Sequence, residues 1–76
     1  MQEAILLTTV GCHLCDQALA IIQRAAPALR VALLDIADDD ALIAEYGERI
    51  PVLRIQGQEL QWPFSLLDVR QALAAR

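Results

Sequence analysis

Two cysteines, Cys12 and Cys15, stand in a Cys-x-x-Cys spacing and are the residues of this sequence best suited to chemistry. Thiolates act as nucleophiles and as metal ligands, and positions three apart on a helix lie within reach across one turn. Two cysteines are too few for a disulfide scaffold. In a reducing compartment the spacing therefore favours dithiol redox chemistry or metal binding.

The two thiols are predicted to occupy different environments. Cys12 falls where a first strand gives way to a helix, at or near the N-cap, where free N–H groups and the helix dipole lower a thiol pKa. Gly11 leaves room there for the turn and for an approaching chain. Cys15 lies in the apolar stripe of the helix. We therefore predict that Cys12 is the nucleophile and Cys15 the buried resolving thiol of dithiol exchange.

His13 lies between the cysteines and falls on the polar side of the predicted helix, so it is expected to be exposed. A partly protonated imidazole at this position would stabilise the neighbouring thiolate or adjust the reduction potential. The alternative is a solvated residue with no part in the site. The sequence leaves both interpretations open.

The first half of the chain contains the elements that must position the cysteines. Residues 4–8 predict a strand covered on both faces, and residues 14–26 predict a helix that ends before Pro27. Residues 31–36 predict a second buried strand. The inward stripes of the helix consist of Leu14, Ala18, Ile21 and Ala25 beside Cys15, Leu19, Ile22 and Ala26.

The second half predicts a short helix, a hairpin and a last helix. Acidic residues 38–40 suit the start of a helix over 41–46, with Gly47 as a left-handed stop. A hairpin follows, with arms at 52–55 and 59–62. Pro63 suits the first turn of the last helix, whose inward stripe consists of Leu66, Val69 and Leu73.

The predicted order of elements is β-α-β-α-β-β-α within a single domain, residues 1–76. A strand–helix–strand unit implies a right-handed parallel crossover, and the hairpin adds antiparallel strands. We therefore expect an α/β fold with a four-stranded mixed sheet and helices on both faces.

Composition excludes several classes of partner. The chain is 57% apolar, its net charge is −4 and its six basic residues are all arginine, which disfavours nucleic acid. Charged residues and a proline interrupt the most apolar region, residues 14–36, so no membrane span is expected. Residues 1–9 lack the basic start and apolar core of a signal peptide. We expect a cytoplasmic protein.

The motifs resemble the glutaredoxins of the thioredoxin-fold superfamily, and most closely the short bacterial glutaredoxin-like proteins that carry C-H-L-C and W-P-F segments. The segments that carry the resemblance are Leu7-Thr8-Thr9-Val10-Gly11-Cys12-His13-Leu14-Cys15-Asp16, Arg49-Ile50-Pro51-Val52 and Trp62-Pro63-Phe64. It implies a thioredoxin-like fold with strand order 2-1-3-4 and a cis peptide bond between Ile50 and Pro51 beside the cysteines, and we expect the chain to be a monomer. It also implies that the backbone of Ile50 binds an extended substrate.

The sequence departs from this family where glutathione is usually held. Thr9 replaces a lysine three residues before the first cysteine, and residues 61–65 replace a Gly-Gly and acidic pair. Arg49 stands in place of the threonine of a Thr-Val-Pro segment and could pair with a substrate carboxylate. Trp62 and Phe64 could form the wall of a substrate groove, although packing in a small core is the favoured interpretation.

The sequence therefore predicts a thiol–disulfide oxidoreductase that acts on protein or small-molecule disulfides and holds no cofactor tightly. Its electrons would come from glutathione or from a partner resembling thioredoxin reductase. One alternative is a metal-binding or metal-delivery module, although a closed zinc site needs four ligands. Another is a binding module that keeps the fold without turnover.

Overall fold

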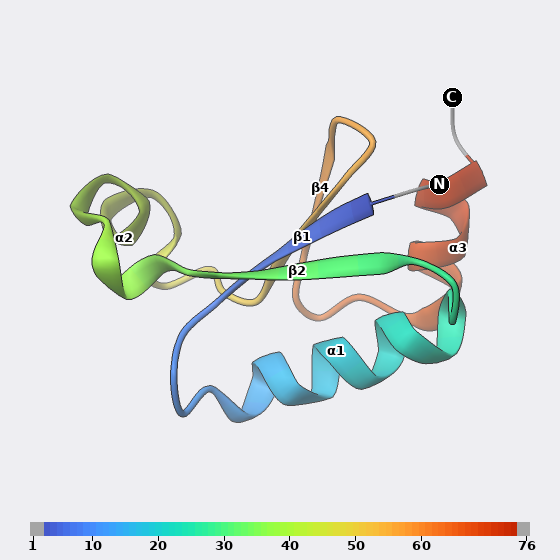
Figure 1. The fold of residues 1–76 in the computed structure, drawn as a ribbon, viewed down its shortest axis with the longest axis horizontal. Helices are drawn as coiled ribbons and strands as arrows, with labels where there is room; N and C mark the ends of the chain where they lie inside the picture. The colour runs from blue at the N-terminus through green and yellow to red at the C-terminus, as the bar shows by residue number, and fades with distance from the viewer. Residues whose placement is uncertain (1–2, 75–76) are drawn as a thin grey trace.

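The elements follow one another in the predicted order in the computed structural model, which describes residues 3–74 (Figure 1). They are β1 (Glu3–Thr8), α1 (His13–Ala25), β2 (Arg30–Asp35), a 3-10 helix η1 (Ile36–Asp38), α2 (Asp40–Tyr46), β3 (Val52–Ile55), β4 (Gln58–Gln61) and α3 (Leu66–Ala74). The sheet order is β2-β1-β3-β4. The β1–β2 pair is parallel, and the β1–β3 and β3–β4 pairs are antiparallel. The predicted α/β fold and strand order are confirmed.

The larger core lies on the face of the sheet that α1 and α3 cover (Figure 1). Leu6 of β1 and Leu53 of β3 are register partners and are both fully buried there. The rest of this buried cluster consists of Ala4, Ala18, Ile22, Ile55, Phe64, Val69 and Ala72. Trp62 packs against the edge of the cluster, with its ring edge-on to Phe64 at a centroid distance of 5.2 Å. Core packing is thus the role of Phe64.

The opposite face is covered only at one end, where α2 lies. Leu7 and Val52 face each other in the register and form a second core with Ile36 and Tyr46. Farther along the same face Ile5 is 38% exposed. The prediction that the first strand is covered on both faces is therefore wrong at Ile5, because α2 is too short to extend that far.

The prediction of a buried second strand is also wrong. β2 lies at the edge of the sheet, and Leu33 and Leu34 are 58% and 37% exposed. Val31 packs against the larger core, but α1 does not cover the later residues of β2. A run of apolar residues resembles a central strand, whereas the position of a strand in the sheet depends on partners distant in sequence.

Polar side chains cap the starts of α2 and α3. The Asp39 carboxylate accepts from the backbone amides of Ala41 and Leu42 at 2.9 and 3.1 Å, as the acidic run predicts. Ser65 and Asp68 form a reciprocal capping box at the start of α3, with N–H···O distances of 2.9 and 3.1 Å.

Three local details differ from the predictions. Gly47 has right-handed helical angles (φ −51°, ψ −36°), so it is not a left-handed stop. Pro63 follows a cis peptide bond and precedes α3, because the capping box at Ser65 fixes a later helix start. The hairpin turn is shorter than expected: β4 already begins at Gln58, which leaves a two-residue turn of Gln56 and Gly57, both with positive φ.

Leu14 is 47% exposed, contrary to its predicted inward position. α3 lies beside the later turns of α1, and the first turn of α1 extends beyond it (Figure 1). Cys15, Ala18 and Ile22 are the buried residues of the helix. In residues 3–74, no helix has the length and apolar character needed to cross a membrane.

We predict that Ile22→Ala destabilises the protein strongly. Ile22 is fully buried beneath α3 and the sheet, so truncation leaves a cavity that costs about 2–5 kcal/mol. Leu67→Ala, at a position 60% exposed, is the matched control and should change the stability by less than about 0.5 kcal/mol. Urea denaturation measures both values. Equal losses in the two variants would contradict this packing.

Candidate functional site

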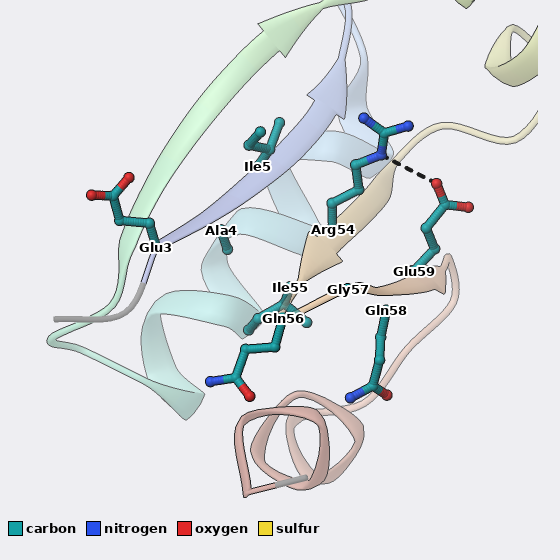
Figure 2. Close-up of a pocket in the computed structure, with 9 residues that line it drawn as sticks. All are labelled: Glu3, Ala4, Ile5, Arg54, Ile55, Gln56, Gly57, Gln58 and Glu59. Carbon is teal, nitrogen blue, oxygen red and sulfur yellow. Dashed lines mark hydrogen bonds and ion pairs between the residues drawn. The ribbon is translucent and has the colours of Figure 1, made fainter. Parts of the chain in front are cut away.

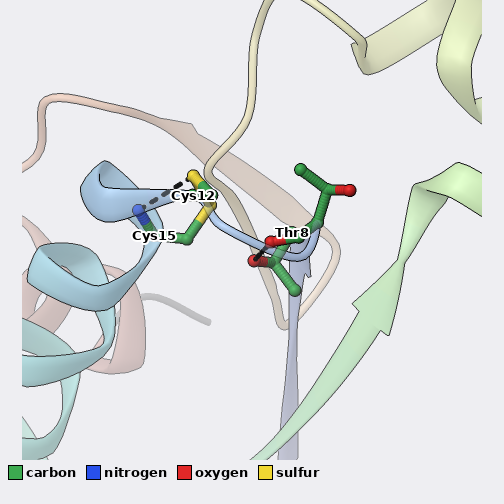
Figure 3. The surroundings of a disulfide bond; sticks show 4 residues. Thr8, Cys12 and Cys15 are labelled. Carbon is green, nitrogen blue, oxygen red and sulfur yellow. Dashed lines mark hydrogen bonds between the residues drawn. A yellow bond between two sulfur atoms is a disulfide. The ribbon is translucent and has the colours of Figure 1, made fainter.

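Cys12 and Cys15 lie at the start of α1 and form a disulfide, with their Cα atoms 5.2 Å apart (Figure 3). Cys12 is the N-cap residue, as predicted. Its sulfur accepts a hydrogen bond from the backbone N–H of Cys15 at 3.1 Å, and its carbonyl accepts from the amide of Asp16 at 3.3 Å. The Cys12 sulfur thus lies among the free N–H groups of a helix start, which favour negative charge.

The two sulfurs differ in exposure. Cys15 is 4% exposed and contributes to the buried side of α1, whereas Cys12 is only half-buried. This difference follows from their positions, since the N-cap lies at the tip of the helix and the third helical residue faces the sheet. An incoming disulfide can therefore reach Cys12 more readily than Cys15.

A four-residue loop, 9–12, carries the chain from the end of β1 to α1. Gly11 has φ +79°, in the left-handed region where residues with a Cβ are strained. No atom beyond its two chain neighbours lies within 4 Å of the place where a Cβ would stand, so conformation rather than crowding favours glycine.

A groove of about 350 Å³ opens beside Cys12, between the start of α1 and the edge strand β2. Thr8 and Asp35 are register partners across β1 and β2, and both line it. Leu33 lines it as well because its register partner, Leu6, faces α1. The remaining lining residues include Val10 and Asp16. The sequence predictions did not include this groove, since its β2 wall was expected to be buried.

The Ile50–Pro51 segment enters β3 next to the end of β1. The peptide bond between the two residues is cis, as the family resemblance implies. Val52 pairs with Leu7, so continuing the register places Pro51 opposite Thr8, near the loop that carries Cys12. Pro51 is fully buried, and its carbonyl accepts from the amide of Trp62 at 3.2 Å. Ile50 is half-buried against the second core.

Arg49 is directed away from the cysteines, into a cluster on the α2 side of the sheet. Its guanidinium lies 3.5 Å from Glu45 and 3.6 Å from Glu59, and 5.0 Å from the centre of the Tyr46 ring. With the Gln61 amide assigned so that its oxygen faces Arg49, that oxygen accepts from Nε and Nη2. These contacts occupy the group that was predicted to meet a substrate carboxylate.

Tyr46 is at the centre of this cluster, which the sequence did not indicate. Its hydroxyl donates to Glu59 at 2.6 Å and accepts from Arg54 at 2.8 Å, and Arg54 also donates to Glu59 at 3.2 Å. Figure 2 shows the Arg54–Glu59 pair beside a cavity of about 400 Å³ between β1 and the hairpin. The hydrogen bond from the Tyr46 hydroxyl lowers the pKa of the Glu59 carboxyl, and the hydrogen bond from Arg54 lowers it further. The hydrogen bond that Arg54 donates to Tyr46 is the largest cause of the raised pKa of Arg54, and its hydrogen bond to Glu59 is the next.

His13 and Trp62, the other predicted site residues, do not line the groove. His13 is exposed on the first turn of α1, next to Cys12. Trp62 is half-buried against the core. Within residues 3–74, no three side chains of the histidine, cysteine, aspartate or glutamate type are arranged to hold a metal ion.

A Cys-x-x-Cys pair at the start of the first helix, on a sheet of order β2-β1-β3-β4, defines a dithiol domain of thioredoxin-like fold. The chain belongs to the glutaredoxin-like domain family (DUF836), whose model matches residues 3–74. No curated protein matches it.

Two solved structures of a target protein, XcR50 from X. campestris, are similar to the chain. The X-ray structure is 43% identical, covers 96% of this chain and 99% of that one, and has a TM-score of 0.84. The solution structure is 41% identical, with coverage of 100% and 97% and a TM-score of 0.85. The similarity thus extends over nearly the whole of both chains.

We predict that iodoacetamide alkylates Cys12 at least about tenfold faster than Cys15 in the reduced protein, because Cys12 is half-buried at a helix N-cap and Cys15 is buried. Peptide mapping after short exposure measures both rates. The single variants Cys12→Ser and Cys15→Ser show which thiol each rate belongs to. Equal rates would overturn the assignment of Cys12 as nucleophile.

We predict that Glu59→Gln removes part of the acid dependence of stability. The Tyr46 bond lowers the pKa of Glu59 from its ordinary 4.5, so the folded state gains stability when this group is ionised. The stability that ionised Glu59 contributes is fully present above the ordinary pKa of 4.5. It is lost as the pH falls through the lowered pKa of the folded state. The gap in melting temperature between wild type and Glu59→Gln should therefore shrink below pH 4.5.

The control is Glu48→Gln, which removes the same charge outside the cluster and should keep the acid dependence of wild type. A gap between wild type and Glu59→Gln that stays constant at all pH values would show that the Tyr46–Glu59 bond does not couple folding to ionisation.

Proposed function

We propose that this chain is a thiol–disulfide oxidoreductase in which Cys12 attacks and Cys15 resolves. The observation that carries the proposal is the pairing of a half-buried sulfur at a helix N-cap with a buried sulfur close enough to form a disulfide. Membership of the glutaredoxin-like domain family supports it.

The first step consumes the thiolate of Cys12. Its sulfur attacks one sulfur of the substrate disulfide, a Cys12–substrate disulfide forms, and the other substrate sulfur leaves as a thiolate that takes up a proton. The Cys15 N–H, which donates to the Cys12 sulfur, and the free amides at the helix start stabilise the attacking thiolate. His13, on the next position, is proposed to assist through its exposed imidazole.

The second step uses Cys15. Its thiol loses a proton and attacks the sulfur of Cys12, which forms the disulfide seen in the structure and releases the second substrate thiol. The substrate gains two electrons and two protons, and the protein loses them. Burial restricts Cys15 to this internal attack. We further propose that the backbone of Ile50, before Pro51, aligns an extended substrate beside the loop of Cys12.

A thiol donor must return two electrons to the disulfide in each cycle. We assign this role to glutathione or to a protein resembling thioredoxin reductase, acting in the cytoplasm. One copy of the chain contains both sulfurs, so we propose that it acts as a monomer with no tightly bound cofactor. No observation favours the metal module, for which Cys12 and Cys15 supply two of the four ligands of a closed site.

We predict that Cys15→Ser accumulates a mixed disulfide with a peptide disulfide substrate, because the second step is blocked while the first remains. Cys12→Ser should lose turnover by at least about two orders of magnitude. Intact mass after acid quenching shows the adduct, and release of peptide thiol under an excess of donor gives turnover. Oxidation without any mixed disulfide, or full turnover in Cys12→Ser, would overturn the mechanism.

A further inference from the structure

The groove between α1 and β2 ends at the proposed nucleophile, yet none of the steps above uses it. Cys12 and Gly11 lie at one end, and Leu33 and Asp35 of β2 form the opposite wall. It lies on the β2 side of β1, whereas Ile50 and Pro51 lie on the β3 side. A substrate aligned by Ile50 would therefore leave this groove unfilled on the other side of the reacting sulfur.

The lining of the groove combines apolar surface with negative charge. Val10 is 89% exposed and Leu33 is 58% exposed, which leaves two apolar side chains in water beside Cys12. Asp16 of α1 and Asp35 of β2 supply two carboxylates, and no arginine lines the groove. In the part of the chain that the structure describes, neither carboxylate forms a salt bridge, although Asp35 caps η1 through the amide of Ala37.

We propose that this groove is a substrate subsite that takes a basic and an apolar residue flanking the half-cystine of a peptide disulfide. The inference rests on the proposed function and gives it a substrate class. The apolar residue would cover Leu33 and Val10, and the cationic side chain would lie between Asp16 and Asp35. The net charge of −4 attracts the same class of partner at longer range.

The same charges disfavour a small anionic substrate. A glutathionyl group carries two carboxylates and one ammonium, so its net charge is negative and is repelled by the like charges of Asp16 and Asp35. Arg49, the cation nearest in sequence to the Ile50–Pro51 segment, is already bound to Glu45 and Glu59. The described residues thus offer basic peptides a complementary surface beside Cys12 and offer a glutathionyl disulfide none.

The test compares two peptide amides that differ at two flanking positions, which carry positive charge in one peptide and negative charge in the other. Each contains a Leu-Cys pair flanked by two lysines or two glutamates, with its cysteine joined to thionitrobenzoate. Attack by Cys12 on the peptide sulfur forms the mixed disulfide and releases coloured thionitrobenzoate, and Cys15 then releases the peptide thiol. We expect the reduced wild-type protein to react about fivefold faster with the lysine peptide at low ionic strength, and the ratio to approach one in about 1 M salt.

The variant Asp16→Asn/Asp35→Asn removes both groove carboxylates, and asparagine can keep the cap on η1. It should reduce the ratio of the two rates to about one or two. The matched control, Glu3→Gln/Glu48→Gln, removes the same charge from exposed positions outside the groove and should keep most of the ratio. Leu33→Gln should slow the reaction of the lysine peptide with the protein. It should slow a lysine peptide in which serine replaces leucine by a smaller factor, because that peptide lacks the apolar side chain proposed to cover Leu33.

The outcomes separate the two proposals. Equal rates for both peptides, a ratio that both double variants lower alike, or faster reaction with glutathione disulfide would overturn the subsite and leave the oxidoreductase in place. Failure to react with any of these disulfides would overturn both proposals. The subsite would be established if Asp16→Asn/Asp35→Asn abolishes the rate ratio between the lysine and glutamate peptides and the control double variant keeps it.

Discussion

β1 pairs with a neighbour on both edges and buries side chains on both faces, and the rest of the structure depends on this constraint. Leu6 faces the core beneath α1 and α3, while Leu7, the next residue, faces the core beneath α2. The strand therefore has little freedom to shift its register. Since the loop that ends at Cys12 begins where β1 stops, the fixed register of β1 also positions Cys12.

The two faces of the sheet support the site in different ways. On one, α1 and α3 share the larger core and hold the helix that contains both cysteines. On the other, Tyr46 joins α2 to the hairpin through hydrogen bonds with Glu59 and Arg54. Arg49, which directly precedes Ile50, is bound to the same cluster through Glu59. Polar contacts on the second face thus fix the segment that enters β3, while apolar packing on the first fixes the cysteines.

Local patterns predicted much of this fold because their causes are local. The periodicity of residues 14–26, the Asp39 cap and the spacing of Cys12 and Cys15 all act within one or two helical turns. The exposure of Leu33 depends on sheet order and on how far α1 extends, which no window of sequence contains. The Tyr46–Glu59 bond joins residues 13 apart through the hairpin register, so composition gave no sign of it.

The hydrogen bond from the Cys15 amide to the Cys12 sulfur has a thermodynamic consequence. A thiolate at Cys12 would accept this bond more strongly than the disulfide sulfur does, so the bond would favour the reduced form of the pair. By linkage, the free energy that this bond adds to the reduced form over the oxidised one shifts the equilibrium toward the dithiol by the same amount. A contact that caps a helix would in this way also contribute to the reduction potential of the two sulfurs.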